Sequence, residues 1–195
     1  MPPRIDPTGD IPREIKFTAE LRGQSLTFAS TWGLFSPKAI DEGTRLLLDR
    51  IAVEPADRCL DLGCGYGAIG LTLARLAPQG TTLLVDKDSV AVEYARRNVD
   101  RNRLTNCEVV TSNGFDALQG RGFDLVASNL PAKVGNELLT ILIADAHSHL
   151  APGGRLYVVT LSGMRRFIER TMRGVFGNYE KLKQGRQHTV ALAVR

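Results

Sequence analysis

The sequence of 195 residues is poor in the features that secreted, membrane-spanning and zinc-binding proteins depend on. Its three cysteines, Cys59, Cys64 and Cys107, are odd in number and lack Cys-x-x-Cys or zinc-ribbon spacing, which favours reduced thiols. No stretch is apolar for long enough to span a bilayer, and the N-terminal residues have no apolar run typical of a signal peptide. We therefore expect a cytoplasmic protein that does not bind membranes.

Histidine is also scarce, which argues against a metal site. Two of the three histidines, His147 and His149, stand two positions apart. A helix does not place residues at this spacing on one face, so the pair does not form a metal-binding motif. We predict no bound metal and interpret both histidines as surface residues.

The composition predicts one globular domain after a short tail. Residues 1–14, MPPRIDPTGDIPRE, contain four prolines and no apolar run, so we expect a flexible N-terminal tail. The chain is 43% hydrophobic and 24% charged, which suits a domain with a sizeable core over residues 15–195.

Positive charge is concentrated at the C-terminal end. The net charge of the chain is +4, but Arg155 to Arg195 contain nine Lys or Arg against the two acids Glu169 and Glu180, a balance of +7. The other 154 residues therefore carry −3. A basic end on a mildly acidic body favours a polyanionic partner such as nucleic acid. The alternative is that these arginines form the solvated face of a helix.

Short apolar runs alternate with segments of helical periodicity, which is typical of a parallel sheet covered on both faces. We predict strands at 58–62, 81–86, 107–111, 123–128 and 155–161, and helices near 66–77, 89–102, 136–149 and 163–175. Asp88 and Ser89 are candidate caps of the second of these helices, and Gly153-Gly154 a candidate end of the third. An earlier helix is predicted from Ser36-Pro37 to about Ile51.

The last seventeen or so residues favour a hairpin. NYEKLKQGRQHTVALAV has the composition of two strands around a Gln-Gly-Arg turn. We therefore expect the sheet to end in an antiparallel pair.

A glycine motif stands where the first of these five strands should meet its helix. Gly65-x-Gly67-x-x-Gly70 fits the pattern in which a backbone loop approaches a ligand at a helix N-terminus. A tight strand-helix turn without a ligand is the alternative.

Two acidic residues indicate which ligand this loop binds. Asp61 precedes the glycines at the strand end, where a carboxylate would repel a pyrophosphate but hold a cationic amino group. Asp86 ends the next strand and is placed to accept both hydroxyls of a ribose. A ligand with an amino acid cation at one end and a ribose in its middle is S-adenosylmethionine.

A nicotinamide cofactor is the competing hypothesis. Tyr179 and Lys183 match the Tyr-x-x-x-Lys pair of short-chain dehydrogenases. That pair has to share a helix face, whereas this segment has a strand-like composition, and four residues of strand span about 13 Å. We reject this hypothesis.

These motifs resemble those of class I methyltransferases, and specifically of the methyltransferase-small family, which includes ribosomal RNA guanine-N2 methyltransferases. A second motif, TWGLFSPKAIDEGTRLLLDRI at 31–51, is similar to the block that this family carries before its glycine loop. The resemblance runs from about Phe17 to Arg195. It implies a Rossmann-like α/β fold with a seven-stranded, mostly parallel sheet of order 3-2-1-4-5-7-6, helices on both faces and a C-terminal antiparallel hairpin. Larger bacterial members carry a second, degenerate copy of the domain ahead of the catalytic one. We find no such copy in this sequence and expect it to be similar to the single-domain relatives.

The resemblance also implies a cofactor site for S-adenosylmethionine, with S-adenosylhomocysteine as product. Its residues would be Phe35, Asp61, Gly63, Cys64, Gly65, Tyr66, Gly67, Asp86, Lys87, Ser112, Asn113, Gly114 and Asn129. The family usually has Ser-Asp after the third strand, and here the pair is Ser112-Asn113. An Asn oxygen can accept the same hydrogen bond from the adenine amine. Phe115 is a candidate for packing on the adenine ring or, equally, for the core.

The main departure from the family lies after the fourth strand. Base-amine methyltransferases of this group have Asn-Pro-Pro-aromatic there, and this chain has Asn129-Leu130-Pro131-Ala132. An exocyclic amine is a weak nucleophile, and hydrogen-bond acceptors for its two N–H groups assist its attack on the methyl group. The Asn129 side chain and the Leu130 carbonyl remain able to accept, and Pro131 completes the candidate catalytic motif. Ala132 cannot stack on a flipped base. The alternative is that Asn129 is only a polar turn residue.

Other residues are candidates for contacting the acceptor. Trp32 or Phe35 could supply the missing stacking face, and Lys133, Arg165 and Arg166 could contact phosphates. The sequence thus predicts a methyltransferase acting on the N2 amine of a guanine in ribosomal RNA, as a monomer or homodimer. Two alternatives stay open: a small-molecule or protein acceptor, and a cofactor- or RNA-binding module without activity.

Overall fold

The computed structural model describes residues 14–195. Most of the predicted tail, residues 1–13, lies outside the described residues. Glu14, the last residue assigned to that tail, forms ion pairs with Lys16 at 3.4 Å and Arg101 at 3.0 Å.

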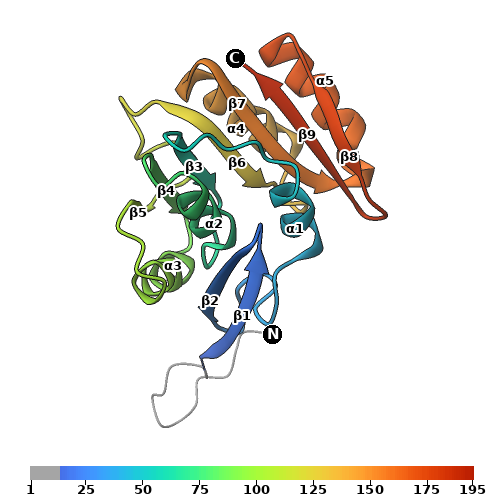
Figure 1. The fold of residues 1–195 in the computed structure, drawn as a ribbon. Coiled ribbons are helices and arrows are strands. Elements are labelled where there is room, and N and C mark those ends of the chain that lie inside the picture. Colours follow the sequence, from blue (N-terminus) through green and yellow to red (C-terminus); the bar gives the residue numbers. More distant parts are fainter. Residues whose placement is uncertain (1–13) are drawn as a thin grey trace.

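The centre of the fold is a seven-stranded sheet in the order β5-β4-β3-β6-β7-β9-β8 (Figure 1). Neighbouring strands from β5 to β7 are parallel, whereas β9 is antiparallel to both β7 and β8. The strands are β3 (Arg58–Leu62), β4 (Thr81–Asp86), β5 (Cys107–Thr111), β6 (Phe123–Asn129), β7 (Leu150–Leu161), β8 (Glu180–Gln184) and β9 (His188–Val194). This arrangement confirms the predicted fold class, the order of the strands and the C-terminal hairpin.

Helices cover both faces of the sheet because its central strands are apolar on both sides. Helices α1 (Glu42–Leu48), α2 (Ala68–Leu76) and α3 (Ser89–Arg101) share one buried cluster with the sheet, and α4 (Asn136–His149) and α5 (Arg165–Phe176) share the other. Successive residues of β6 alternate between the two clusters: Leu125 and Ala127 belong to the first, and Val126 to the second. A single 3-10 turn, η1 (Ser162–Met164), separates β7 from α5.

Helix α1 is shorter than predicted and starts later. Its N-cap is Asp41, whose side chain accepts a hydrogen bond from the Thr44 backbone N–H. Ser36 has a φ of 47°, in the left-handed region, whereas an N-cap residue needs an extended backbone. The predicted start at Ser36-Pro37 is therefore wrong, and residues 36–40 form a loop that leads to Asp41.

The helix predicted at 136–149 has the bounds of α4, but the prediction that Gly153-Gly154 ends it is wrong. The helix ends at His149 and β7 follows at Leu150, so Gly153 and Gly154 lie inside the strand. Regular pairing of β7 with β6 runs from Arg155 to Val159, which is where the apolar run placed the strand.

A two-stranded hairpin before α1 was not predicted. It consists of β1 (Ile15–Leu21) and β2 (Gln24–Ser30), paired antiparallel over seven residue pairs. The turn residues Arg22 and Gly23 both have positive φ, as two-residue hairpins require. The alternation of IKFTAEL and QSLTFAS around Arg-Gly is the pattern that could have revealed it.

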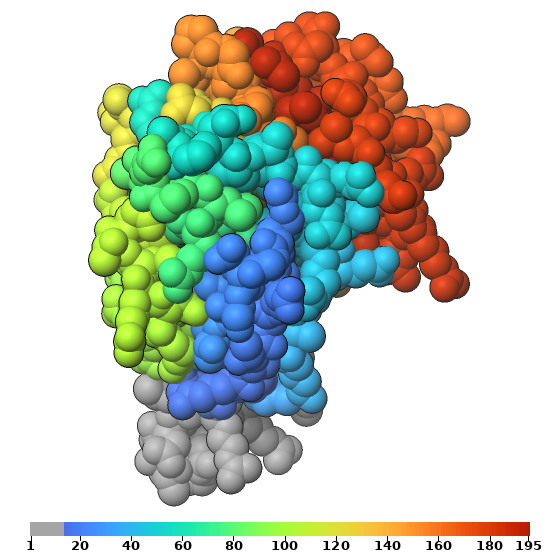
Figure 2. Space-filling view, in the orientation of Figure 1, coloured from blue at the N-terminus to red at the C-terminus, as the bar shows by residue number. Residues whose placement is uncertain are grey.

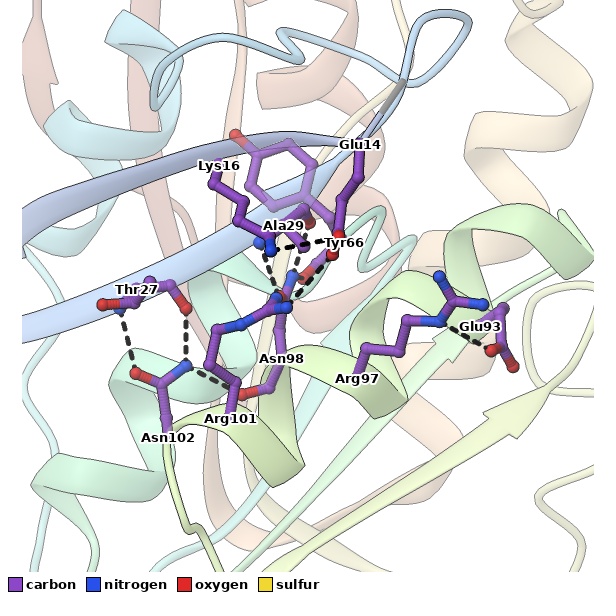
Figure 3. A network of polar contacts seen from close by, with 10 residues as sticks. All are labelled: Glu14, Lys16, Thr27, Ala29, Tyr66, Glu93, Arg97, Asn98, Arg101 and Asn102. Atoms are coloured by element: carbon purple, nitrogen blue, oxygen red, sulfur yellow. Dashed lines mark hydrogen bonds and ion pairs between the residues drawn. The ribbon is translucent and has the colours of Figure 1, made fainter. Parts of the chain in front are cut away.

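Two buried asparagines of α3 fasten this hairpin to the domain (Figure 3). Asn98 bonds both the backbone N–H and the carbonyl of Ala29, at 2.7 and 2.8 Å, and Asn102 bonds the same two groups of Thr27, at 3.0 and 2.8 Å. One helical turn therefore matches a two-residue step along the strand. Asn98 also donates to the Tyr66 carbonyl at 2.9 Å, which links the hairpin to the glycine loop.

Three further features bear on the class of protein. No helix in the described part of the chain combines the length and apolar character needed to cross a membrane. All three cysteines are free. Within residues 14–195 no group of three or more His, Cys, Asp or Glu side chains could hold a metal ion.

Candidate active site

Most of the predicted cofactor residues, and Asn129, lie at the carboxyl ends of β3, β4, β5 and β6, the edge that points toward the N-terminal hairpin in Figure 1. Ligands of open α/β sheets bind at this edge.

The glycine loop, residues 63–67, joins β3 to α2. The backbone N–H groups of Gly63 and Cys64 both donate to the Val85 carbonyl at 2.9 Å, which fixes the loop against β4. Gly65 has a φ of 55° and donates its N–H to Asp86 Oδ2 at 2.9 Å. A Cβ built on Gly63 or Gly65 would meet nothing within 4 Å. One side of the loop backbone therefore faces open space that a ligand can occupy.

Asp61 lies beneath this loop and is completely buried. Its Oδ2 accepts a hydrogen bond from the Gly70 N–H of α2 at 2.7 Å, whereas its buried Oδ1 has no partner among residues 14–195. The pKa of this carboxyl is raised to about 7, mainly by burial and further by the nearby charge of Asp86, while the hydrogen bond from the Gly70 N–H lowers it. An unpartnered carboxylate oxygen at this position fits a cationic donor.

Asp86 ends β4 with its carboxylate partly exposed. Its Oδ2 accepts from Gly65 and its Oδ1 accepts from the Asp88 N–H at 3.0 Å. Each carboxylate oxygen has a second lone pair, so both can still accept from a ribose hydroxyl. The next residue, Lys87, is exposed beside it.

The loop after β5 forms the third part of the site. The Ser112 N–H donates to the Asp86 carbonyl at 2.9 Å, and the buried Ser112 hydroxyl donates to the Gly114 carbonyl. Asn113 is exposed, and its Nδ2 donates to Asp116 Oδ2 at 3.3 Å, which leaves its Oδ1 as an acceptor. Phe115 is buried and stacks on His149, with ring centroids 4.7 Å apart, so it belongs to the core.

Asn129 is the last residue of β6 and its amide is held from two sides. Its Nδ2 donates to Asp41 Oδ2 and to Thr44 Oγ1, both at 3.1 Å. The Leu130 N–H donates to the Val159 carbonyl at 3.0 Å, a bond that a proline at this position could not make. Asn129 Oδ1 and the Leu130 carbonyl accept no hydrogen bond from the described residues.

The loop before α1 carries two exposed aromatic rings. Trp32 is 55% exposed and Phe35 is 68% exposed, and the Lys38 ammonium lies 4.5 Å from the centroid of the Trp32 ring. This loop is anchored to the glycine loop by the Tyr66 hydroxyl, which lies 3.3 Å from the carbonyls of both Ser36 and Ala39.

Two predicted cofactor residues in the glycine loop have buried side chains. Burial raises the pKa of the Cys64 thiol well above its usual range, so the sulfur is a neutral packing group. The Tyr66 ring is also buried, in contact with the N-terminal hairpin through Phe17 and Phe28. Only the backbone of these two residues is available to a ligand on the open side of the loop.

The predicted phosphate contacts lie on two separate segments. Lys133 and Pro131 are exposed in the turn after β6. Arg165 and Arg166 line an open groove of about 530 Å³ between α5 and β8, together with Glu169, Arg173, Tyr179, Glu180 and Lys181. Tyr179 lies just before β8 and Lys183 within it, so the two do not share a helix face.

The surface is hollowed beside this basic segment. Figure 2 shows the β8–β9 hairpin (red) projecting beyond the body, with a hollow between its tip and the loop before α1 (light blue). Arg165 lies at the hairpin end of the groove, since its Nη1 donates to Gln184 Oε1 at 3.0 Å. Asn129 pairs with Val159, only two residues before the end of β7, so this groove begins near the candidate site.

Asp41 and Thr44 belong to the motif at 31–51, and sequence reasoning alone does not identify them as partners of Asn129. The signal that could have found them is the Asp-x-Gly-Thr spacing, because an N-cap Asp and a Thr three residues later share one helix end. Their contact with Asn129 joins segments that are 88 and 85 residues apart.

Comparison with known proteins decides the family. The methyltransferase small domain matches residues 25–191. The chain belongs to this family. Within it, the Bacillus subtilis protein YbxB, which is uncharacterized, is 34% identical over 141 residues, 71% of this chain and 70% of that protein. The ribosomal RNA small subunit methyltransferase C of Haemophilus influenzae is 35% identical over 165 residues, 83% of this chain and 49% of that protein.

The solved structures include one close in fold. The Thermus thermophilus 16S rRNA N2 G1207 methyltransferase, in complex with AdoMet and guanosine, superposes with a TM-score of 0.85 at 27% identity. The match covers 93% of this chain and 50% of that one, so the chain spans about half the length of its ribosomal RNA methyltransferase relatives. The methyltransferase family and fold predicted from the sequence are confirmed.

Proposed function

We propose that this protein transfers a methyl group from S-adenosylmethionine to the N2 amine of a guanine in ribosomal RNA. The observation that carries the proposal is the amide of Asn129, whose nitrogen is tied to Asp41 and Thr44 while its oxygen takes no partner from the described residues. Relatives named as ribosomal RNA methyltransferases support the choice of acceptor.

Residues of three loops would hold the cofactor. The unpartnered oxygen of Asp61 is placed for the cationic amino group of the methionine moiety, Asp86 for the ribose hydroxyls and Asn113 for the adenine amine. The open side of Gly63 and Gly65 leaves room for the ligand between these groups. When bound, S-adenosylmethionine would supply an electrophilic methyl group attached to a sulfonium. The leaving group is a neutral thioether, which needs no acid.

The residues after β6 act on the acceptor. Asn129 Oδ1 and the Leu130 carbonyl accept hydrogen bonds from the two N–H groups of the exocyclic amine. These bonds orient the nitrogen lone pair toward the methyl group and stabilise the positive charge that develops on the nitrogen. The proton that the nitrogen loses passes to water at the open edge of the sheet. Catalysis rests on positioning and on these two acceptors.

The nucleic acid is held by surfaces on either side of this point. The basic groove lined by Arg165, Arg166 and Lys181 supplies contacts for phosphates. Trp32 is an exposed aromatic surface that can stack on a flipped base, a role that Ala132 cannot fill. The free cysteines are consistent with a cytoplasmic substrate.

Ala132 also favours a second candidate function. Without the family's aromatic residue, the acceptor could be a small molecule or a protein side chain that needs no stacking face. The cofactor loops are shared by both functions, so cofactor affinity does not separate them.

The test is transfer of labelled methyl from S-adenosylmethionine to total RNA, total protein and a small-metabolite extract. We expect label in RNA, and we expect Asn129→Ala to lower kcat about 100- to 1,000-fold, as loss of one polarising group does. Asn136→Ala, an exposed asparagine at the start of α4, is the matched control and should keep full activity. Trp32→Ala should raise the KM for RNA with little change in the KM for the cofactor.

The distribution of label distinguishes the alternatives. Label in protein or metabolites alone would replace the RNA acceptor by the second candidate. Absence of label from all three fractions, with cofactor binding intact, would leave a binding module without activity.

A further inference from the structure

We infer that Asp41 and Thr44 are positioning residues for the methyl acceptor, because they fix which end of the Asn129 amide faces the substrate. The inference rests on the proposed role of Asn129. Both residues act through the two 3.1 Å hydrogen bonds that they accept from Asn129 Nδ2.

The orientation follows from the chemistry of the partners. An ionised carboxylate can only accept hydrogen bonds, so the group of Asn129 that faces Asp41 has to be the amide nitrogen. Thr44 Oγ1 accepts from the same nitrogen, and two acceptors therefore take up the two N–H bonds of Nδ2. The oxygen is left as the only group of this amide that a substrate can reach. A substrate amine, which donates, needs this orientation and not the reverse.

Asp41 is itself held rigidly at the start of α1. Its Oδ2 accepts the Thr44 backbone N–H at 3.1 Å, so the carboxylate is the N-cap of the helix as well as the partner of Asn129. The residue between them, Gly43, leaves no room for a side chain: a Cβ there would lie 2.8 Å from His188 Cδ2 and 2.9 Å from Asp41 Oδ2.

These contacts give each member of Asp41-x-Gly43-Thr44 a task. The aspartate caps the helix and accepts from Asn129, the glycine lets β9 pack against the helix start through His188, and the threonine supplies the second acceptor. The helix start, β6 and β9 are thereby joined next to the candidate catalytic residue.

The charge of Asp41 should also matter for the chemistry. A hydrogen bond from the amide nitrogen to a carboxylate polarises the amide and makes its oxygen a stronger acceptor. The same negative charge lies on the side of the site where the substrate nitrogen becomes positive. Loss of this charge should therefore lower the rate of transfer more than the binding of either substrate.

The experiment compares Asp41→Asn with wild type in methyl transfer to RNA. Asparagine caps helices as well as aspartate does and has the same shape, so the fold should be kept. Its side chain can donate as well as accept, so it no longer imposes one orientation on Asn129. We expect kcat to fall about 10- to 100-fold, while the Kd for S-adenosylmethionine and the thermal midpoint stay close to wild type.

Three variants serve as controls. Glu42→Gln removes an equal charge from the first turn of α1 at an exposed position and should keep full activity. Thr44→Ser keeps the hydroxyl and should remain within about threefold of wild type, whereas Thr44→Val removes it and should lower kcat. If Asp41→Asn fails to fold, the comparison of Thr44→Val with Thr44→Ser still tests the positioning role, and equal kcat values for these two variants would overturn it.

The outcomes separate this inference from the function on which it rests. If wild type methylates RNA, Asn129→Ala does not, and Asp41→Asn has the kcat of wild type, the positioning role is overturned and the function stands. An equal loss in Glu42→Gln would likewise overturn it, since the effect would then be one of general charge. If wild type transfers no methyl group to RNA, the proposed function fails whatever the variants do.

Discussion

The loops after β3 and β4 and the loops after β6 and β7 meet at one edge of the sheet, but their polar groups are held by contacts of different range. Asp61 accepts from Gly70, nine residues away, and Asp86 accepts from Gly65 and from Asp88. Asp61, the glycine loop and Asp86 lie within one β-loop-α-β unit, and the third cofactor loop follows the next strand, β5. Local motifs on consecutive strands are therefore enough to build this half, the cofactor half.

The acceptor half is assembled from distant parts of the chain. Asn129 is bonded to Asp41 across 88 residues, and the helix start that carries Asp41 packs against His188 of β9. The two halves also differ in charge: the first contains the carboxylates of Asp61 and Asp86, whereas the basic groove between α5 and β8 is formed by segments that follow β7. The cofactor half should therefore be sensitive to local packing, and the acceptor half to long-range contacts and to salt.

The largest effect is expected from breaking the packing of the cofactor half with Gly70→Ala. A Cβ on Gly70 would lie 2.4 Å from Leu84 Cγ, and Leu84 is completely buried. Alanine gains about 1 kcal/mol of helix propensity over glycine, but overpacking of a filled core costs about 1–3 kcal/mol and should win. We expect lower stability in chemical denaturation.

The matched control for this prediction is Gly174→Ala in α5. A Cβ there would meet nothing within 4 Å, so only the propensity term remains, and the variant should be more stable by up to about 1 kcal/mol. Equal effects of the two substitutions would contradict the difference in packing between the two helices.

A second prediction concerns Asp61 and pH. The carboxyl has a pKa of about 7 in the ligand-free fold against an ordinary value of 3.8. Between about pH 4 and pH 7 this carboxyl is ionised in the unfolded chain but still protonated in the folded protein. Its contribution to the free energy of unfolding therefore falls as the pH rises. Asp61→Asn removes this slope and should make the ligand-free protein more stable at pH 8.

The affinity for S-adenosylmethionine should rise with pH, whereas the stability falls. A cationic amino group requires the ionised carboxylate, so wild-type affinity should fall up to about tenfold per pH unit below pH 7. At pH 8, Asp61→Asn should bind S-adenosylmethionine about 10- to 100-fold more weakly, since a hydrogen bond to a charged group contributes about 1.5–3 kcal/mol. Calorimetric titration of both proteins between pH 6 and 8 measures this, and identical affinities at pH 8 would remove Asp61 from the cofactor site.

The same division explains what could be predicted from the sequence. The strands Arg58–Leu62, Thr81–Asp86 and Cys107–Thr111 have the boundaries that their apolar runs indicated. In the first two of these segments the local pattern and the tertiary environment agree, because strands buried on both faces are continuously apolar. Cys107–Thr111 lies at the edge of the sheet and is only partly buried. Asp61 and Asp86 could be placed because each stands at or next to the last residue of a buried strand.

Prediction failed at Ser36-Pro37, where one local signal competed with another, and at contacts between segments that are distant in the sequence. Ser36-Pro37 has the composition of a helix start, but Ser36 takes a left-handed backbone and Asp41 caps the helix instead. The N-terminal hairpin is held by Asn98 and Asn102, polar residues on a helix, and no spacing in the sequence connects them to β2. The contact of Asn129 with Asp41 has the same origin, because it depends on how α1 packs against the end of β6.

The smallest effect is expected from the basic groove of the acceptor half. Arg166 is exposed and lines that groove, whereas Arg103 is an equally charged, exposed residue just after α3 on the opposite face of the sheet. If Arg166 contacts one phosphate, Arg166→Ala should reduce the slope of log affinity for RNA against log salt by about 0.7–0.9, and Arg103→Ala should not. Neither variant should change S-adenosylmethionine affinity, because neither residue lies at the cofactor loops. Equal salt slopes in wild type and both variants would place the RNA contacts elsewhere on the surface and leave the arginines of α5 as a solvated helix face.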